Sequence, residues 1–130
     1  MKKKIILSIL IIILITSLFT ISIFIKNIKT QSYSIGKTIT NLNHTELVNC
    51  NYNYNYLSIN IKVNNSNNEN INIKIYDPKE ILLDEIDVKG NDSIDYSNNF
   101  DGIKGDHKIV FSQNNGNPNY NFTIDLYGKN

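Results

Sequence analysis

Apolar and polar side chains alternate along most of the chain beyond residue 56, and this period of two limits what the chain can fold into. The alternation is clearest in Leu57–Val63, Ile71–Ile75, Ile86–Val88, His107–Phe111 and Tyr120–Leu126, and weaker near residues 35 and 94. Strict alternation is typical of strands that bury one face and expose the other. Segments rich in Asn, Gly and Asp separate these stretches and favour turns. The pattern predicts an all-β fold, a small antiparallel β-sandwich of about seven strands.

A second feature is the apolar run at residues 5–25, in which Ser and Thr are the only polar residues. As a helix rising roughly 1.5 Å per residue, the run would be about 31 Å long, close to the hydrocarbon core of a bilayer at about 30 Å. We therefore expect one N-terminal transmembrane helix before the sandwich. Lys2, Lys3 and Lys4 precede the run and only two lysines follow it closely, which favours a cytoplasmic N-terminus.

The apolar run can be retained as a signal-anchor or cleaved as a signal peptide. It is longer than the roughly 7 to 15 apolar residues of a signal peptide, and the chain has no Ala for an Ala-x-Ala cleavage site. We expect a single-pass protein of the cell membrane whose C-terminal domain lies outside the cytoplasm; secretion after cleavage is the alternative. The predicted organisation is a basic cytoplasmic stub at 1–4, the signal-anchor helix at 5–25, a linker at 26–34 and the extracytoplasmic β-sandwich at 35–130.

The distribution of charge argues against a nucleic-acid partner. The formal net charge of the chain is +1. Residues 31–130 hold eight lysines and all twelve acidic residues, so this part carries about −4, whereas binding to nucleic acid needs a basic face. Asn, Ile, Lys and Tyr, which AT-rich codons encode, are abundant, and we expect a bacterial source with an AT-rich genome.

The segment "NYNYNY" at residues 51–56 alternates in the opposite phase to the strand that follows it. A shift of one residue turns every side chain of a strand to the other face. Either a β-bulge near Tyr56 returns the tyrosines to the core, or they form an exposed aromatic row. The sequence favours burial of at least two of the three. If they are exposed, Tyr52, Tyr54 and Tyr56 are the candidate surface for a sugar ring or a partner protein.

The sequence holds no motif for catalysis, for a metal or for a cofactor. Cys50 is the only cysteine, so it cannot form a disulfide within the chain, and we expect it to be buried as a small apolar residue. Pairing of Cys50 between two chains remains open. His44 and His107 do not lie beside a plausible nucleophile. Residues 97–102 resemble the start of a calcium loop, but the first and twelfth positions, where the loop needs Asp and Glu, hold Ser97 and Lys108.

Two segments carry a family resemblance. "INIKIYDPKE" (71–80) and "FDGIKGDHKIVFSQN" (100–114) resemble extracytoplasmic accessory β-sandwich domains of bacteria, of the pre-peptidase C-terminal or GOLD-like type. Asp77 and Pro78 match the turn of such domains, whereas Glu80 replaces an expected glycine and His107 an expected aromatic residue. The resemblance implies a domain that binds or supports and does not catalyse.

These features together predict a membrane-anchored, extracytoplasmic binding or interaction module without catalytic activity. Its expected partners are the lipid bilayer, through residues 5–25, and a cell-wall polymer or another envelope protein. The alternative function is a small secreted or anchored hydrolase of the cell envelope, of unknown mechanism, that uses its acidic loop.

Overall fold

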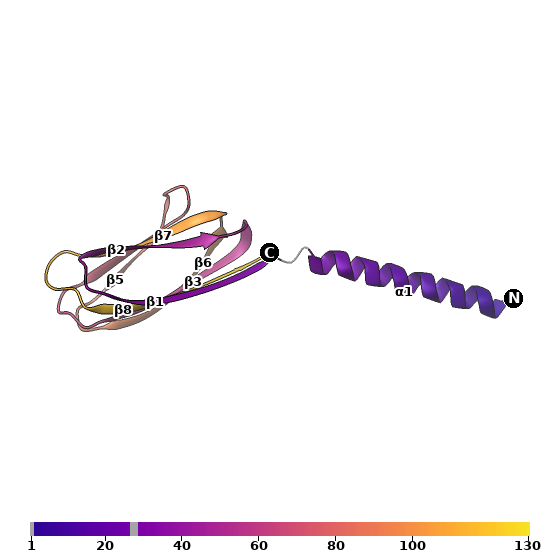
Figure 1. Ribbon diagram of the computed structural model, residues 1–130, viewed down its shortest axis with the longest axis horizontal. Helices are drawn as coiled ribbons and strands as arrows, with labels where there is room; N and C mark the ends of the chain where they lie inside the picture. The colour runs from indigo at the N-terminus through magenta and orange to yellow at the C-terminus, as the bar shows by residue number, and fades with distance from the viewer. Residues whose placement is uncertain (1, 27–28) are drawn as a thin grey trace.

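A computed structural model describes the backbone of residues 2–26 and 29–130, and the side chains of residues 6, 8–22 and 29–130. One helix, α1 (Lys2–Lys26), precedes eight strands (Figure 1). The strands are β1 (Thr30–Ile39), β2 (Asn43–Cys50), β3 (Tyr54–Asn65), β4 (Ile71–Tyr76), β5 (Leu82–Val88), β6 (Ser93–Gly102), β7 (Gly105–Gln113) and β8 (Tyr120–Lys129).

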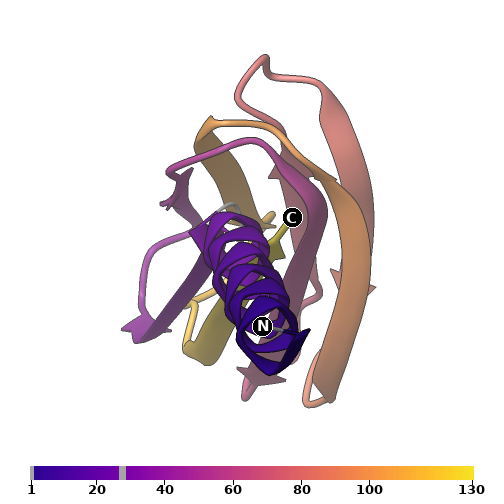
Figure 2. The same cartoon turned by 90° about the vertical axis from the view of Figure 1, so that its right-hand side faces the viewer.

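The strands form two antiparallel sheets of four. The first sheet has the order β1-β8-β3-β6 and the second the order β2-β7-β4-β5. The chain crosses between the sheets at every connection except the hairpin between β4 and β5, and Figure 2 shows the two layers edge-on beyond α1. This is the arrangement of an eight-stranded jelly roll. The predicted antiparallel β-sandwich is therefore confirmed, with eight strands.

The core lies between the sheets and is built from the inward residues of the alternating stretches. Its fully covered members are mostly branched aliphatic side chains, which suit half-buried strands: Leu57, Ile59, Ile61, Ile71, Ile73, Ile75, Val88, Ile109, Ile124 and Val48. Phe111 stacks between Phe122 and Tyr120, with ring centroids 4.5 and 5.9 Å away. These contacts join β7 of the second sheet to β8 of the first.

Strand β2 was not predicted, because apolar and polar residues do not alternate along its first half. Its inward positions include His44 and Glu46, whereas Leu47 points outward and is 56% exposed. Burial therefore alternates along β2 while hydropathy does not, and a search for alternating apolar residues passes over it.

The predicted linker at 26–34 is wrong in its second half. β1 begins at Thr30, five residues before the predicted start of the domain, and residues 30–34 pair with residues 125–129 of β8. The backbone N–H of Asn130 also donates to the carbonyl of Lys29 at 3.2 Å. The C-terminus thus lies beside the start of β1, at the end of the sandwich nearer α1 (Figure 1).

The helix expected at residues 5–25 is present as α1. Thr16, Ser17 and Thr20 donate their hydroxyl hydrogens to backbone carbonyls three or four residues earlier, at 2.8–3.1 Å. Within the residues that the structure describes, no helix is long and apolar enough to cross a membrane. The predicted transmembrane span is therefore not confirmed.

Candidate binding surface

The outward residues of the first sheet form a regular array, which we call the polar face. Strand pairing places them in four rows of four across β1, β8, β3 and β6. The rows are Ser32, Tyr127, Ser58 and Asn99; Ser34, Asp125, Asn60 and Ser97; Gly36, Thr123, Lys62 and Asp95; and Thr38, Asn121, Asn64 and Ser93. All sixteen are exposed or partly exposed. Thirteen are uncharged, and Tyr127 is the only large ring, so the surface offers mainly short hydroxyl and amide groups.

Hydrogen bonds between neighbouring strands fix many of these side chains. Ser34 donates to Asp125, Thr38 donates to Asn121 at 2.6 Å, and Ser97 donates to the side-chain oxygen of Asn60 at 2.7 Å. Lys62 lies 3.2 Å from Asp95 in the third row, and Ser93 donates to Asn64 at 3.3 Å in the fourth. The side-chain oxygens of Asn121 and Asp125 retain a lone pair for an external donor, whereas that of Asn60 already accepts from both Ser97 and Ser58, so Asn60 offers a ligand its NH2 group. The array is therefore ordered before any ligand arrives.

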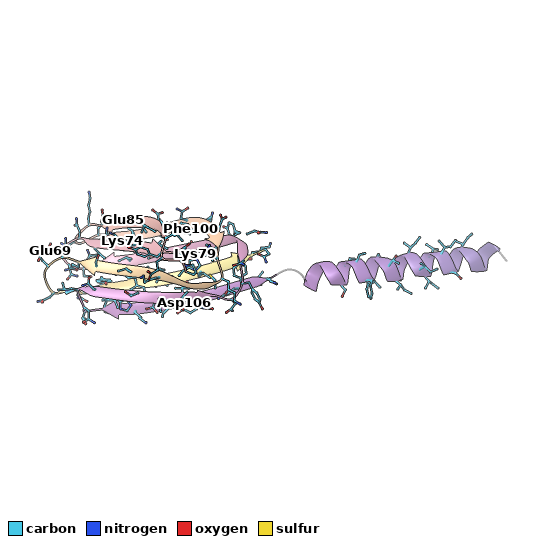
Figure 3. All side chains as sticks on the ribbon, turned by 90° about the horizontal axis from the view of Figure 1, so that it is seen from above. Glu69, Lys74, Lys79, Glu85, Phe100 and Asp106 are labelled. Carbon is cyan, nitrogen blue, oxygen red and sulfur yellow. The ribbon has the colours of Figure 1, made fainter. Side chains whose placement is uncertain are left out.

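The outer face of the second sheet has a different character. Lys74 lies 3.4 Å from Glu85, and Lys108 lies 3.1 Å from Glu80. Figure 3 labels Lys74 and Glu85, which lie close together on this face. Lys108 also lies over the ring of Tyr76, 5.3 Å from its centroid. Long charged side chains in exposed pairs are typical of an ordinary solvated surface, and the contrast singles out the polar face.

A shallow hollow of about 400 Å³ lies at one end of the polar face. It is bounded by residues of β3, β6 and β8, namely Lys62, Val63, Asn64, Ser93, Ile94, Asp95, Asn121, Phe122 and Thr123. Its lining is mainly apolar and combines polar residues of the third and fourth rows with Val63, Ile94 and Phe122, so a ligand held there would meet apolar surface as well as donors and acceptors from three strands.

Two exposed tyrosines lie at the other end of the polar face. Tyr127 of β8 is opposite Ser58 of β3, and Tyr56 of β3 is opposite Lys129. Tyr56 and Tyr127 are therefore diagonal neighbours on one face, a separation that aromatic side chains can bridge. They are 44% and 42% exposed. Together they offer apolar ring surface next to the hydroxyl and amide array.

The predicted tyrosine row is divided by a β-bulge. The register of β3 against β6 shifts between Tyr54 and Leu57, so of the two alternatives the β-bulge is the one present. Tyr54 is 3% exposed, whereas Tyr52 and Tyr56 are 46% and 44% exposed. The prediction that at least two of the three are buried is wrong, because the bulge returns only Tyr54 to the core. Tyr52 precedes β3 and lies against Tyr54 edge-on, beneath the ammonium group of Lys29.

Of the predicted tyrosines, only Tyr56 borders the polar face, diagonal to Tyr127 of its first row. Tyr127 was missed, although its signal is present in the sequence. It continues the outward phase of β8, in which the core residues occupy even positions.

Inward-facing polar side chains lie at the two open edges of the sandwich. On the side of β1 and β2, the Glu46 carboxylate accepts hydrogen bonds from Lys37 at 2.7 Å and His44 at 3.1 Å. Burial opposes ionisation of Glu46, but these hydrogen bonds and the positive charge of Lys37 leave its pKa lowered. On the side of β5 and β6, the Tyr96 hydroxyl donates to Asp84 at 2.6 Å. Inward charges on edge strands discourage pairing with other sheets, so both clusters have a structural role.

The other candidate residues named from the sequence lie in the core or in a strand. Cys50 lies in the core, as predicted, and burial raises the pKa of its thiol to about 11. Ser97–Gly102, the segment that resembles the start of a calcium loop, is part of strand β6. The described residues contain no group of three or more His, Cys, Asp or Glu side chains placed to hold a metal ion.

Comparison with known proteins supports the fold. No protein-family model and no curated protein matches the chain. A chain from the endospore appendages of Bacillus, which form disulfide-linked pili, is similar with a TM-score of 0.51 and 10% sequence identity. The match covers 78% of this chain and 87% of that one. At this identity the likeness establishes a shared β-sandwich fold.

Two further structures are more distantly similar. The CBM36-1 domain of a multidomain xylanase from the hindgut metagenome of Trinervitermes trinervoides has a TM-score of 0.41 and 14% identity, over 80% of this chain and 97% of that chain. CsCBM6-3 from Clostridium stercorarium has a TM-score of 0.34 and 20% identity, over 79% and 81% of the two chains. The strand topology and the likeness to the endospore-appendage chain confirm the resemblance inferred from the sequence at the level of the β-sandwich only, and the pre-peptidase C-terminal and GOLD-like families are not shown.

Proposed function

We propose that this protein is a non-catalytic binding module whose polar face binds an uncharged, hydroxyl-rich polysaccharide of the cell envelope. The observation that carries the proposal is the array of short hydroxyl and amide side chains, ordered by hydrogen bonds such as those of Asn60 and Asn121. Groups already held in place lose little conformational freedom on binding, which favours affinity.

The chemistry of the polar face suits such a ligand better than other classes. A polysaccharide presents alternating donors and acceptors, which amides and hydroxyls complement. Its rings also have apolar faces that aromatic rings such as Tyr127 can contact. Lys62, Asp95 and Asp125 are the only charged residues among the sixteen, and one basic side chain is far from the basic patch that nucleic acid requires.

The first prediction concerns single substitutions on the polar face. In co-sedimentation of the full-length protein with insoluble envelope polysaccharide, Asn60→Ala should weaken binding about five- to tenfold, because it removes hydrogen bonds worth roughly 1 kcal/mol each. Tyr127→Ala should weaken it by at least as much. Tyr76→Ala, on the outer face of the second sheet, is the matched control and should bind as the parent does. Equal binding by all three variants would assign the ligand to another surface, or the polar face to a partner protein.

We also propose that the sandwich is exported and that residues 5–25 attach it to the outer side of the cytoplasmic membrane. The support is the uncharged run of 21 residues and the hydroxyl groups of Thr16, Ser17 and Thr20, whose hydrogens are satisfied along the helix. Such satisfaction is what an apolar environment demands of polar groups.

The second prediction tests this location. The full-length chain should stay with membranes after a carbonate wash, and protease added to intact protoplasts should digest residues 31–130. A shortened chain in the medium, with a new N-terminus between residues 22 and 33, would establish the secreted alternative. Protection of residues 31–130 from external protease would reverse the proposed orientation.

A further inference from the structure

We propose that the polar face binds an internal segment of a linear polysaccharide, laid along the central strands β3 and β8, and therefore requires a chain of several sugar units. This inference rests on the proposed function and specifies the ligand of the same surface. It follows from the separation of the two features at its ends, the hollow and the tyrosine pair.

The central strands set the length of the site. On β8, Asn121 borders the hollow and Tyr127 belongs to the tyrosine pair. Tyr127 is six positions after Asn121, about 20 Å along an extended strand, and four positions after Thr123, which also borders the hollow, about 13 Å. On β3, Tyr56 and Lys62 mark the same two ends, again six residues apart. A ligand that covers the whole site must extend over this distance, whereas a single sugar or a disaccharide reaches only part of it.

The surface between the two ends is continuous. Asp125 and Asn60 face each other there across β8 and β3, and both are partly covered by their neighbours. Ser34 donates to Asp125 from one side, and Ser97 donates to Asn60 from the other. These side chains are short and are held in place by hydrogen bonds. They therefore form a continuous surface of hydrogen-bonding groups between the two ends of the site.

Both ends of the site are exposed. Asn64 and Asn121 are exposed at the hollow, and Tyr56 and Tyr127 are exposed at the opposite end. A linear polymer can therefore continue past the hollow, whereas the tyrosine pair lies at the end of the sandwich nearer α1; the exposed side chains at both ends do not require a chain terminus. The net charge of the polar face together with the adjacent Lys129 is zero, since two lysines, Lys62 and Lys129, offset Asp95 and Asp125. We expect the affinity to change little with salt, because ion release contributes little to binding of an uncharged polymer.

The experiment is calorimetric titration of the full-length protein with cello-oligosaccharides and chito-oligosaccharides of increasing length. Affinity should rise at least about tenfold from the disaccharide to the hexasaccharide and then level off. Reduction of the terminal sugar should leave the affinity for the hexasaccharide unchanged.

Variants at the two ends separate this inference from the proposed function. Asn64→Ala at the hollow and Tyr127→Ala at the other end should each weaken hexasaccharide binding about fivefold or more. Tyr76→Ala should have no effect. A disaccharide that binds as tightly as the hexasaccharide, or an effect of only one end, would overturn the extended site and leave polysaccharide binding intact. If neither series binds and insoluble envelope polysaccharide also fails to bind, the proposed function fails with it.

Discussion

Tyr54→Ala is expected to lower the free energy of unfolding by roughly 3 to 5 kcal/mol, the range for loss of a large side chain from a core. Tyr54 is 3% exposed, and its ring lies against the backbone of Gly128. A Cβ added at Gly128 would stand 2.6 Å from the Tyr54 ring, and one at Gly102 would stand 2.6 Å from the Tyr54 Cβ. The two glycines make room for the tyrosine, so its removal leaves a cavity that the rigid strands cannot close. Urea titration of both proteins measures the difference.

Tyr56→Ala is the matched control, since it removes the same side chain two residues away on the exposed side of the bulge. Its effect should stay within about 0.5 kcal/mol. Tyr54→Phe isolates the hydrogen bond from the Tyr54 hydroxyl to Gln31, 3.1 Å long, and should cost about 1 kcal/mol. If the two alanine variants unfold at the same urea concentration, the bulge does not separate a buried tyrosine from an exposed one.

Acidification is expected to destabilise the protein below about pH 6.5 because of His107. This side chain is fully buried, and no hydrogen bond of standard geometry reaches either ring nitrogen. Burial lowers the pKa of His107, against smaller opposing effects of the Gly105 carbonyl and of the carboxylates of Asp77 and Asp106. The folded protein therefore binds this proton less readily than the unfolded chain does. The free energy of unfolding is not reduced by His107 at a pH above the pKa of the unfolded histidine, about 6.5. Below that pH it falls by at most about 1.4 kcal/mol per pH unit.

His107→Leu should remove this dependence between pH 7 and pH 5, where the loss in the parent amounts to as much as roughly 2 kcal/mol. Glu46 and Asp84 have lowered pKa values, so their stabilising contributions decline only at lower pH, below about 4.5. Both proteins retain His44, and the difference between their urea titrations at each pH therefore reports His107 alone. Parallel losses of stability in the parent and in His107→Leu would assign the acid sensitivity to other groups.

The sequence predicts the sandwich because alternation is a local property. Residues 57–63 or 120–126 show by themselves which side chains face inward, and the turns between such stretches need no information from elsewhere. β2 has no such local signal, since His44 and Glu46 occupy inward positions where Lys37 of another strand satisfies the carboxylate. The partner that makes those polar residues acceptable inside cannot be read from β2 itself.

The tyrosine segment shows a similar limit. The change of phase after Tyr56 predicts an irregularity, but its position decides which tyrosines turn inward. That position depends on the neighbouring strands, where Gly102 and Gly128 leave space for the Tyr54 side chain. A sequence pattern alone does not pair Tyr54 with these two glycines.

The polar face could not be predicted from short stretches of the sequence for the same reason. Its second row draws on positions 34, 125, 60 and 97, and in the sequence each of these residues is only the polar half of an alternating strand. Strand order and register bring them together, and both are set by contacts far apart in the chain. Tyr127 gains its significance only when β8 is placed beside β3 and Tyr56.

The most direct measurement for the central claim is a map of amide chemical-shift changes in the full-length protein on addition of a soluble oligosaccharide. Our account predicts that the shifted amides gather on β1, β8, β3 and β6 around the polar face, including those of Asn60, Thr123 and Tyr127. The amides around Lys74 and Lys108 on the second sheet should stay in place. Shifts concentrated on the second sheet, or on the tips of the loops, would contradict the claim that the polar face is the binding surface.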